Sequence, residues 1–85
     1  MRAVLVEDFG SIENHKLCNV ADPSPANDEV LIDIRAIGIN FPDTLMMQGL
    51  YQTKPERPFT PGRDVAGIIS AVGKDVEGLK VGDRV

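Results

Sequence analysis

The feature that most constrains the fold is the alternating run at residues 29–39. Apolar side chains recur there at every second position, namely Val30, Ile32, Ile34 and Ala36. Asp33 and Arg35 fall between them and are expected to face solvent. A period of two residues is the pattern of a strand with one buried face. The run therefore predicts a long strand.

The rest of the chain divides into shorter predicted strands and proline-rich loops. Strands are predicted at residues 2–7, 15–20 and 64–72, and a last one begins at residues 81–85. Residues 21–28 and 52–61 are predicted loops, because their prolines lack a backbone donor and do not fit central strands. These elements predict a mainly β fold, barrel-like or sandwich-like, with one short helix.

The predicted helix covers residues 40–49, directly after the long strand. Pro42 suits the first helical position and Asp43 suits the first turn. Gly49 suits the position after the last turn, where the backbone often becomes left-handed. The pattern predicts a helix of two turns attached to the end of the strand.

Composition excludes several classes of protein. The chain has 13 acidic and 9 basic residues and a net charge of −4, so it lacks the basic surface of a nucleic-acid-binding protein. No apolar run is long enough to insert into a membrane, and no leader-like segment is seen, so we expect a cytoplasmic domain. Cys18 and His15, one of each type, cannot build a four-ligand zinc site.

Two positions could carry chemistry. Asn40 ends the long strand, and its amide could either serve a site or cap the following helix. The turn at residues 61–64 presents Arg63 and Asp64, either as a surface pair or toward a cleft. Tyr51, the only tyrosine, lies between these positions and could close over either. His15 is expected to be a solvated surface residue.

The order of four segments resembles the catalytic domain of the medium-chain dehydrogenase/reductase superfamily. These segments are residues 29–40, 42–51, 58–73 and 79–85, and the resemblance extends over residues 1–85. It implies the amino-terminal part of a GroES-like β-barrel. Zinc-dependent members place a cysteine and a histidine where this chain has Asn40 and Arg63. Neither an amide nor a guanidinium ligates zinc, so the sequence is most similar to the zinc-free quinone oxidoreductase branch.

The resemblance also implies roles for individual residues. Asn40 would face the nicotinamide and the substrate carbonyl, as a catalytic and cofactor-binding residue. Tyr51 would bind or orient a quinone. Asp43 occupies the place of a supporting carboxylate, and we hypothesise that it pairs with Arg63. Leu45 stands where some quinone reductases carry another tyrosine, so the substrates of those relatives need not apply.

The implied activity is the NADPH-dependent reduction of a small quinone or enone by direct hydride transfer, without metal. A homodimeric parent protein is also implied. The glycine-rich dinucleotide motif of a Rossmann domain is absent from these 85 residues. The chain ends within a predicted strand, so we expect a fragment that is inactive alone. A non-catalytic β-barrel interaction module and an enoyl-thioester reductase fragment are the alternatives.

Overall fold

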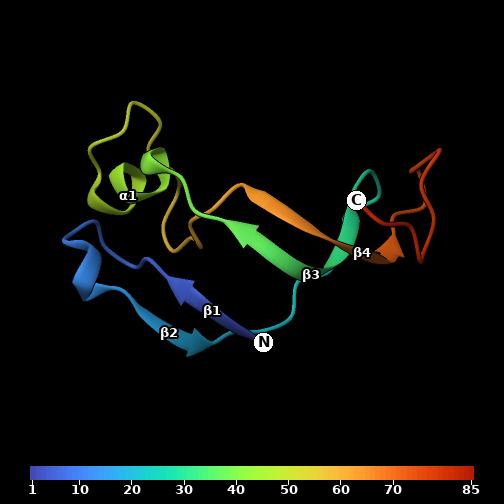
Figure 1. Cartoon of the computed structure of the whole chain (residues 1–85), viewed down its shortest axis with the longest axis horizontal. Helices are drawn as coiled ribbons and strands as arrows, with labels where there is room; N and C mark the ends of the chain where they lie inside the picture. Colours follow the sequence, from blue (N-terminus) through green and yellow to red (C-terminus); the bar gives the residue numbers. More distant parts are fainter. The chain divides into compact units, whose positions relative to one another are not determined.

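The computed structural model describes all residues, 1–85, and is mainly β with one α-helix (Figure 1). Its strands are β1 Arg2–Leu5, β2 Lys16–Asn19, β3 Val30–Gly38 and β4 Asp64–Val72, and its helices are η1 Ile12–Asn14 and α1 Phe41–Gln48. The chain forms two compact units. The first joins Met1–Ala21 with Gly38–Arg63, and the second joins Asp22–Ile37 with Asp64–Val85.

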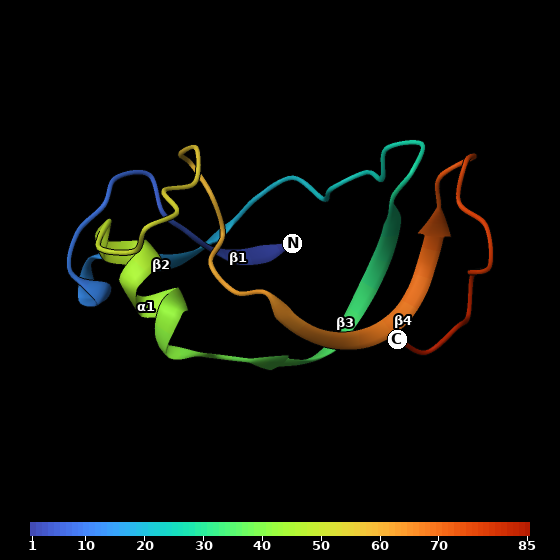
Figure 2. The ribbon, with the colours of Figure 1, turned by 90° about the horizontal axis from the view of Figure 1, so that it is seen from above.

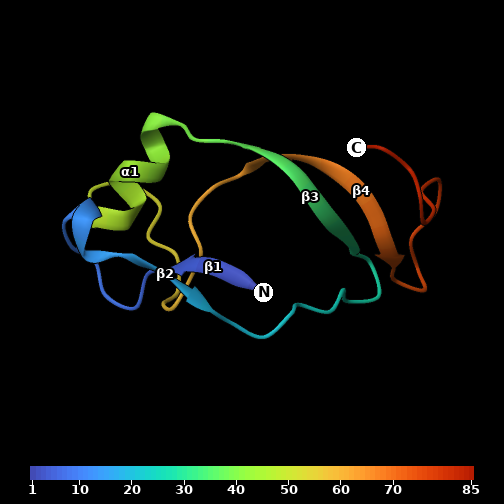
Figure 3. The same ribbon diagram turned by 60° about the horizontal axis from the view of Figure 1, so that its bottom comes forward.

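The first unit contains an antiparallel pair of strands, β1 and β2 (Figure 3). Its register places Ala3 opposite Cys18, and Ala3 is buried. The predicted strands are confirmed here with shorter bounds. Between them the chain forms the 3-10 helix η1, which no sequence pattern predicted. Beside η1, the Ser11 hydroxyl donates a hydrogen bond to Glu13, which lowers the pKa of that exposed carboxyl.

The helix α1 begins and ends close to its predicted limits. Asn40 is the N-cap and Phe41 the first helical residue. Pro42 was predicted at the first helical position and occupies the second. Gly49 ends the helix with a φ of 74°, the left-handed conformation that glycine adopts most easily. Met46 and Met47 are buried in the core of this unit. A helix of eight residues is too short to span a bilayer.

The second unit is built on a two-stranded sheet of β3 and β4 (Figure 2). The strands are antiparallel, since Gly67 lies against Asp33 while Gly73 donates to the Glu29 carbonyl. The predicted bounds of β4 agree with the structure. The predicted strand at residues 81–85 is present as a bridge between Arg84 and Ile68, and four backbone hydrogen bonds join residues 82–85 to β4.

The two faces of β3 differ in how well they agree with the sequence pattern. Asp33 and Arg35 are exposed as predicted and form an ion pair of 3.1 Å. Ile34, on the face predicted to be buried, is 51% exposed. Burial of a sheet face needs a second layer, and the two-stranded sheet leaves Ile34 without one in its own unit. That prediction is therefore wrong for the later part of β3.

Replacing Gly67 by alanine is expected to destabilise the second unit. A Cβ atom at this buried position would overlap the Asp33 carbonyl oxygen and meet Ile32 Cγ2 at 2.7 Å. Overpacking of this kind costs about 1–3 kcal/mol. Urea unfolding followed by circular dichroism would measure the loss.

Gly10→Ala is the matched control, because its Cβ would meet the Asn14 side chain at 3.5 Å, an ordinary contact. Equal stability changes for Gly67→Ala and Gly10→Ala would contradict the close approach of β3 and β4.

Candidate functional site

The four residues singled out from the sequence all belong to the first unit. Asn40 is exposed at the start of α1, and Tyr51 is half-buried two residues after Gly49. Asp43 is buried in the first turn of α1, and Arg63 is exposed immediately before β4. The helix and the loop that follows it therefore present three of the four residues.

Asn40 and Asp43 are joined by the backbone at the start of the helix. The Asn40 N–H donates to Asp43 Oδ2 at 2.9 Å, and the Asp43 N–H donates to the Asn40 carbonyl at 3.0 Å. The pair is arranged as a capping box, which satisfies amides that have no partner within the helix. Of the two alternatives for Asn40, the structure therefore shows the one at the helix N-cap.

The hypothesised pair of Asp43 with Arg63 is wrong. The Asp43 carboxylate, only 6% exposed, accepts from the Asn40 backbone, and Arg63 forms no ion pair. The physical reason is local. An N–H three residues earlier in the chain reaches the carboxylate at little cost in entropy, whereas a distant arginine must be ordered for the purpose.

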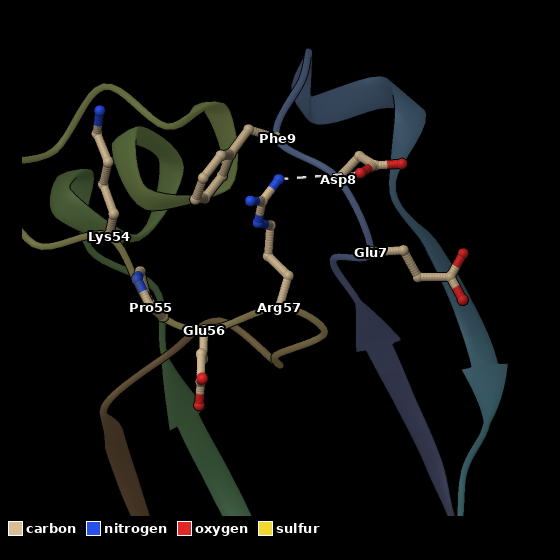
Figure 4. A pocket seen from close by; sticks show the side chains of 7 residues that line it. All are labelled: Glu7, Asp8, Phe9, Lys54, Pro55, Glu56 and Arg57. Carbon is tan, nitrogen blue, oxygen red and sulfur yellow. Dashed lines mark ion pairs between the residues drawn. The ribbon is translucent and has the colours of Figure 1, made fainter.

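A hollow of about 570 Å³ lies elsewhere in the first unit. It is lined by Glu7, Asp8, Phe9, Lys54, Pro55, Glu56 and Arg57 (Figure 4). None of the four residues chosen from the sequence lines it. Both acidic and basic side chains surround this space, so its charge does not select one kind of ligand.

Sequence reasoning missed the part played by the segment after β1. Gly10 N–H donates to the Met47 carbonyl at 3.1 Å, and His15 Nε2 lies 3.2 Å from the same oxygen. His15 is half-buried, so its prediction as a solvated residue is wrong. The last turn of a helix has free carbonyls that need donors. From the sequence, one could infer only that the last carbonyls of the helix need donors. The sequence does not show which segment supplies those donors.

Comparison with known proteins identifies the family of this chain. The alcohol dehydrogenase GroES-like domain family matches residues 26–85, more than half of the chain, and the chain belongs to this family. A quinone oxidoreductase from Lama guanicoe is 50% identical over 86 residues, which cover 100% of this chain and 26% of that protein.

Solved structures agree with this assignment. Human synaptic vesicle membrane protein VAT-1 homolog-like protein has a TM-score of 0.91 at 39% identity, covering 100% of this chain and 28% of its own. Escherichia coli quinone oxidoreductase complexed with NADPH has a TM-score of 0.89 at 36% identity, covering 99% of this chain and 26% of its own. The chain thus forms part of a GroES-like domain and spans about a quarter of these relatives.

Asp43→Ala is expected to lower the free energy of unfolding by about 1 kcal/mol, the usual cost of losing a helix cap. Arg63→Ala should change it little, because Arg63 is exposed and unpaired. Urea unfolding of the two single variants and the double variant would measure their coupling.

We expect a coupling energy near zero. A substantial coupling energy between the two substitutions would instead support the ion pair of Asp43 with Arg63 that was hypothesised from the sequence.

Proposed function

We propose that this chain supplies the substrate side of the catalytic domain of an NADPH-dependent oxidoreductase. Its substrates would be small quinones or other α,β-unsaturated carbonyl compounds. The observation that carries the proposal is the 50% identity to a quinone oxidoreductase across the whole chain. Because the chain spans 26% of that relative, the activity would belong to a longer polypeptide in which residues 1–85 form the amino-terminal part of the catalytic domain.

NADPH supplies the hydride, which its nicotinamide C4 would transfer to the electrophilic carbon of the substrate. The chain has no glycine-rich turn to hold the phosphates, so its own contribution would lie at the nicotinamide end. Asn40 fits that end, because it is exposed and carries an uncharged donor and acceptor. The E. coli relative with NADPH bound supports this cofactor.

Asn40 would donate a hydrogen bond to the substrate carbonyl. No residue of the chain accepts a hydrogen bond from the side-chain N–H groups of Asn40, so they are free to donate. A fixed donor at this oxygen stabilises the negative charge that develops as hydride arrives. The helix-capping and catalytic roles of Asn40 are therefore compatible, and Asp43 would hold the Asn40 backbone in place.

The remaining proposals follow from residue types. Tyr51 would orient the quinone ring with its own half-buried ring. The reaction would be zinc-independent, because Asn40 and Arg63 are not zinc ligands. A homodimeric parent and a cytoplasmic location remain predictions of the family resemblance.

The 85-residue chain alone is expected to show no NADPH-dependent quinone reduction, because it lacks a dinucleotide-binding motif. Oxidation of NADPH in the presence of a simple quinone, followed by absorbance, would test this. Turnover above that of the heat-unfolded chain would contradict the expectation.

A chimera tests the activity directly. This chain would replace the aligned segment of the Lama guanicoe quinone oxidoreductase, with which it shares 50% identity. We expect NADPH-dependent quinone reduction that a zinc chelator does not inhibit. In the chimera, Asn40→Asp should lower kcat by roughly 100-fold, the typical loss for one donor at a developing oxyanion.

Aspartate caps a helix as well as asparagine does, so Asn40→Asp separates the two roles of this residue. Asn19→Asp, on exposed β2, is the matched control for the added charge. A well-folded chimera without activity would refute the proposed function and favour a non-catalytic module. Full activity of Asn40→Asp would refute the role of Asn40 alone.

A further inference from the structure

The loop at residues 50–58, which carries Tyr51, has few attachments of its own. Leu50 N–H donates to the Leu45 carbonyl at 2.9 Å, and residues 51–58 make no hydrogen bond to another part of the chain. A loop without such bonds is ordered only by side-chain contacts and by the way its ends are held. The position of Tyr51 therefore depends on whatever holds those ends.

Phe9 lies against both ends of this loop. At the first end, a Cβ atom added to Gly49 would lie 2.9 Å from Phe9 Cγ, so the aromatic side chain is in direct contact with the glycine backbone. At the second end, the rings of Phe9 and Phe59 are 6.3 Å apart between centroids and inclined by 56°. Tilted aromatic pairs at this distance attract each other.

Arg57, near the second end of the loop, makes a third contact with Phe9. Its guanidinium carbon lies 4.5 Å from the centroid of the Phe9 ring, a cation–π geometry (Figure 4). Arg57 Nη1 is also 3.9 Å from Asp8 Oδ1, but the Asp8 side chain is 94% exposed. An ion pair so exposed contributes little, so the ring is the stronger attachment for Arg57.

The backbone beside Phe9 is fastened to the same two ends. Val6 and Phe59 exchange hydrogen bonds of 2.8 Å and 3.2 Å, and Val6 is fully buried. Gly10 N–H donates to the Met47 carbonyl in the last turn of α1. Phe9 thus lies between two fixed points, one on each side of the Tyr51 loop.

We propose that Phe9 is a positioning residue for Tyr51. By contacting Gly49, Arg57 and Phe59 together, its ring closes the base of the loop and restricts where Tyr51 lies. Phe9 thereby limits which quinones fit, although it does not touch them. The effect on substrate choice rests on the proposed function, in which Tyr51 orients the quinone. The restriction of Tyr51 by Phe9 is independent of that function.

Tyr51 reports on its own position, because the chain contains one tyrosine and no tryptophan. Tyrosine fluorescence of the 85-residue chain would be measured by its anisotropy and by quenching with acrylamide. Phe9→Leu should raise the quenching constant by roughly twofold or more and lower the anisotropy, as expected when a contact of this strength is lost. Phe41→Leu is the matched control, since Phe41 is 73% exposed and lies outside these contacts.

Arg57 provides a second test that does not disturb the core, because its side chain is 45% exposed. Arg57→Gln should also raise the quenching constant of Tyr51 and lower its anisotropy. Arg57→Lys should leave both close to those of the unchanged chain, since lysine keeps a cation over the ring. Unchanged quenching in both Phe9→Leu and Arg57→Gln would overturn the proposal. An equal increase of the quenching constant in Phe41→Leu would also overturn it. If circular dichroism shows that Phe9→Leu is unfolded, the result for Arg57→Gln decides the test.

The chimera separates this proposal from the proposed function. There, Phe9→Leu should raise the KM for the quinone several-fold, with the KM for NADPH unchanged. A loosened Tyr51 in an inactive chimera would refute the proposed function and leave the positioning by Phe9 standing. A loosened Tyr51 with an unchanged quinone KM in an active chimera would refute the effect of Phe9 on substrate.

Discussion

The first unit depends on how the two ends of a short helix are held. Eight residues form too few turns to be stable in water by themselves, so α1 needs support from outside its own hydrogen bonds. Asp43 satisfies the Asn40 amide at one end, and Gly49 turns the chain at the other. Burial of Met46 and Met47 supplies the hydrophobic contribution. Every candidate residue in α1 and the following loop takes its place from this arrangement.

The segment after β1 links this helix to the loop that follows it. It supplies donors to the Met47 carbonyl and places the Phe9 ring between Gly49 and Phe59. Residues far from the proposed chemistry in sequence therefore determine the surroundings of Tyr51. Under the proposed function, such contacts would vary the substrate without changing Asn40, the proposed donor.

The sequence predicted the elements better than their contacts. The bounds of β4 agree with the structure, and those of β3 and α1 differ from prediction by one residue at each end. These elements have strong local signals, namely apolar alternation, a capping pair and a glycine. The helix η1 was missed because three residues carry no periodic pattern. The pairing of Asp43 with Arg63 was wrong because it assumed a distant partner where a local one was available.

Alternation, capping and proline placement act within a few residues, so the amino-acid sequence was enough to locate the four strands and α1. It also placed Asn40 at the end of a strand and Tyr51 in a loop, and it carried the resemblance to the GroES-like family. The contacts of Phe9 with Gly49, Arg57 and Phe59, which lie 40 or more positions further along the chain, became visible only in the folded molecule. Contacts across such separations depend on the path of the whole chain, and no local pattern encodes them.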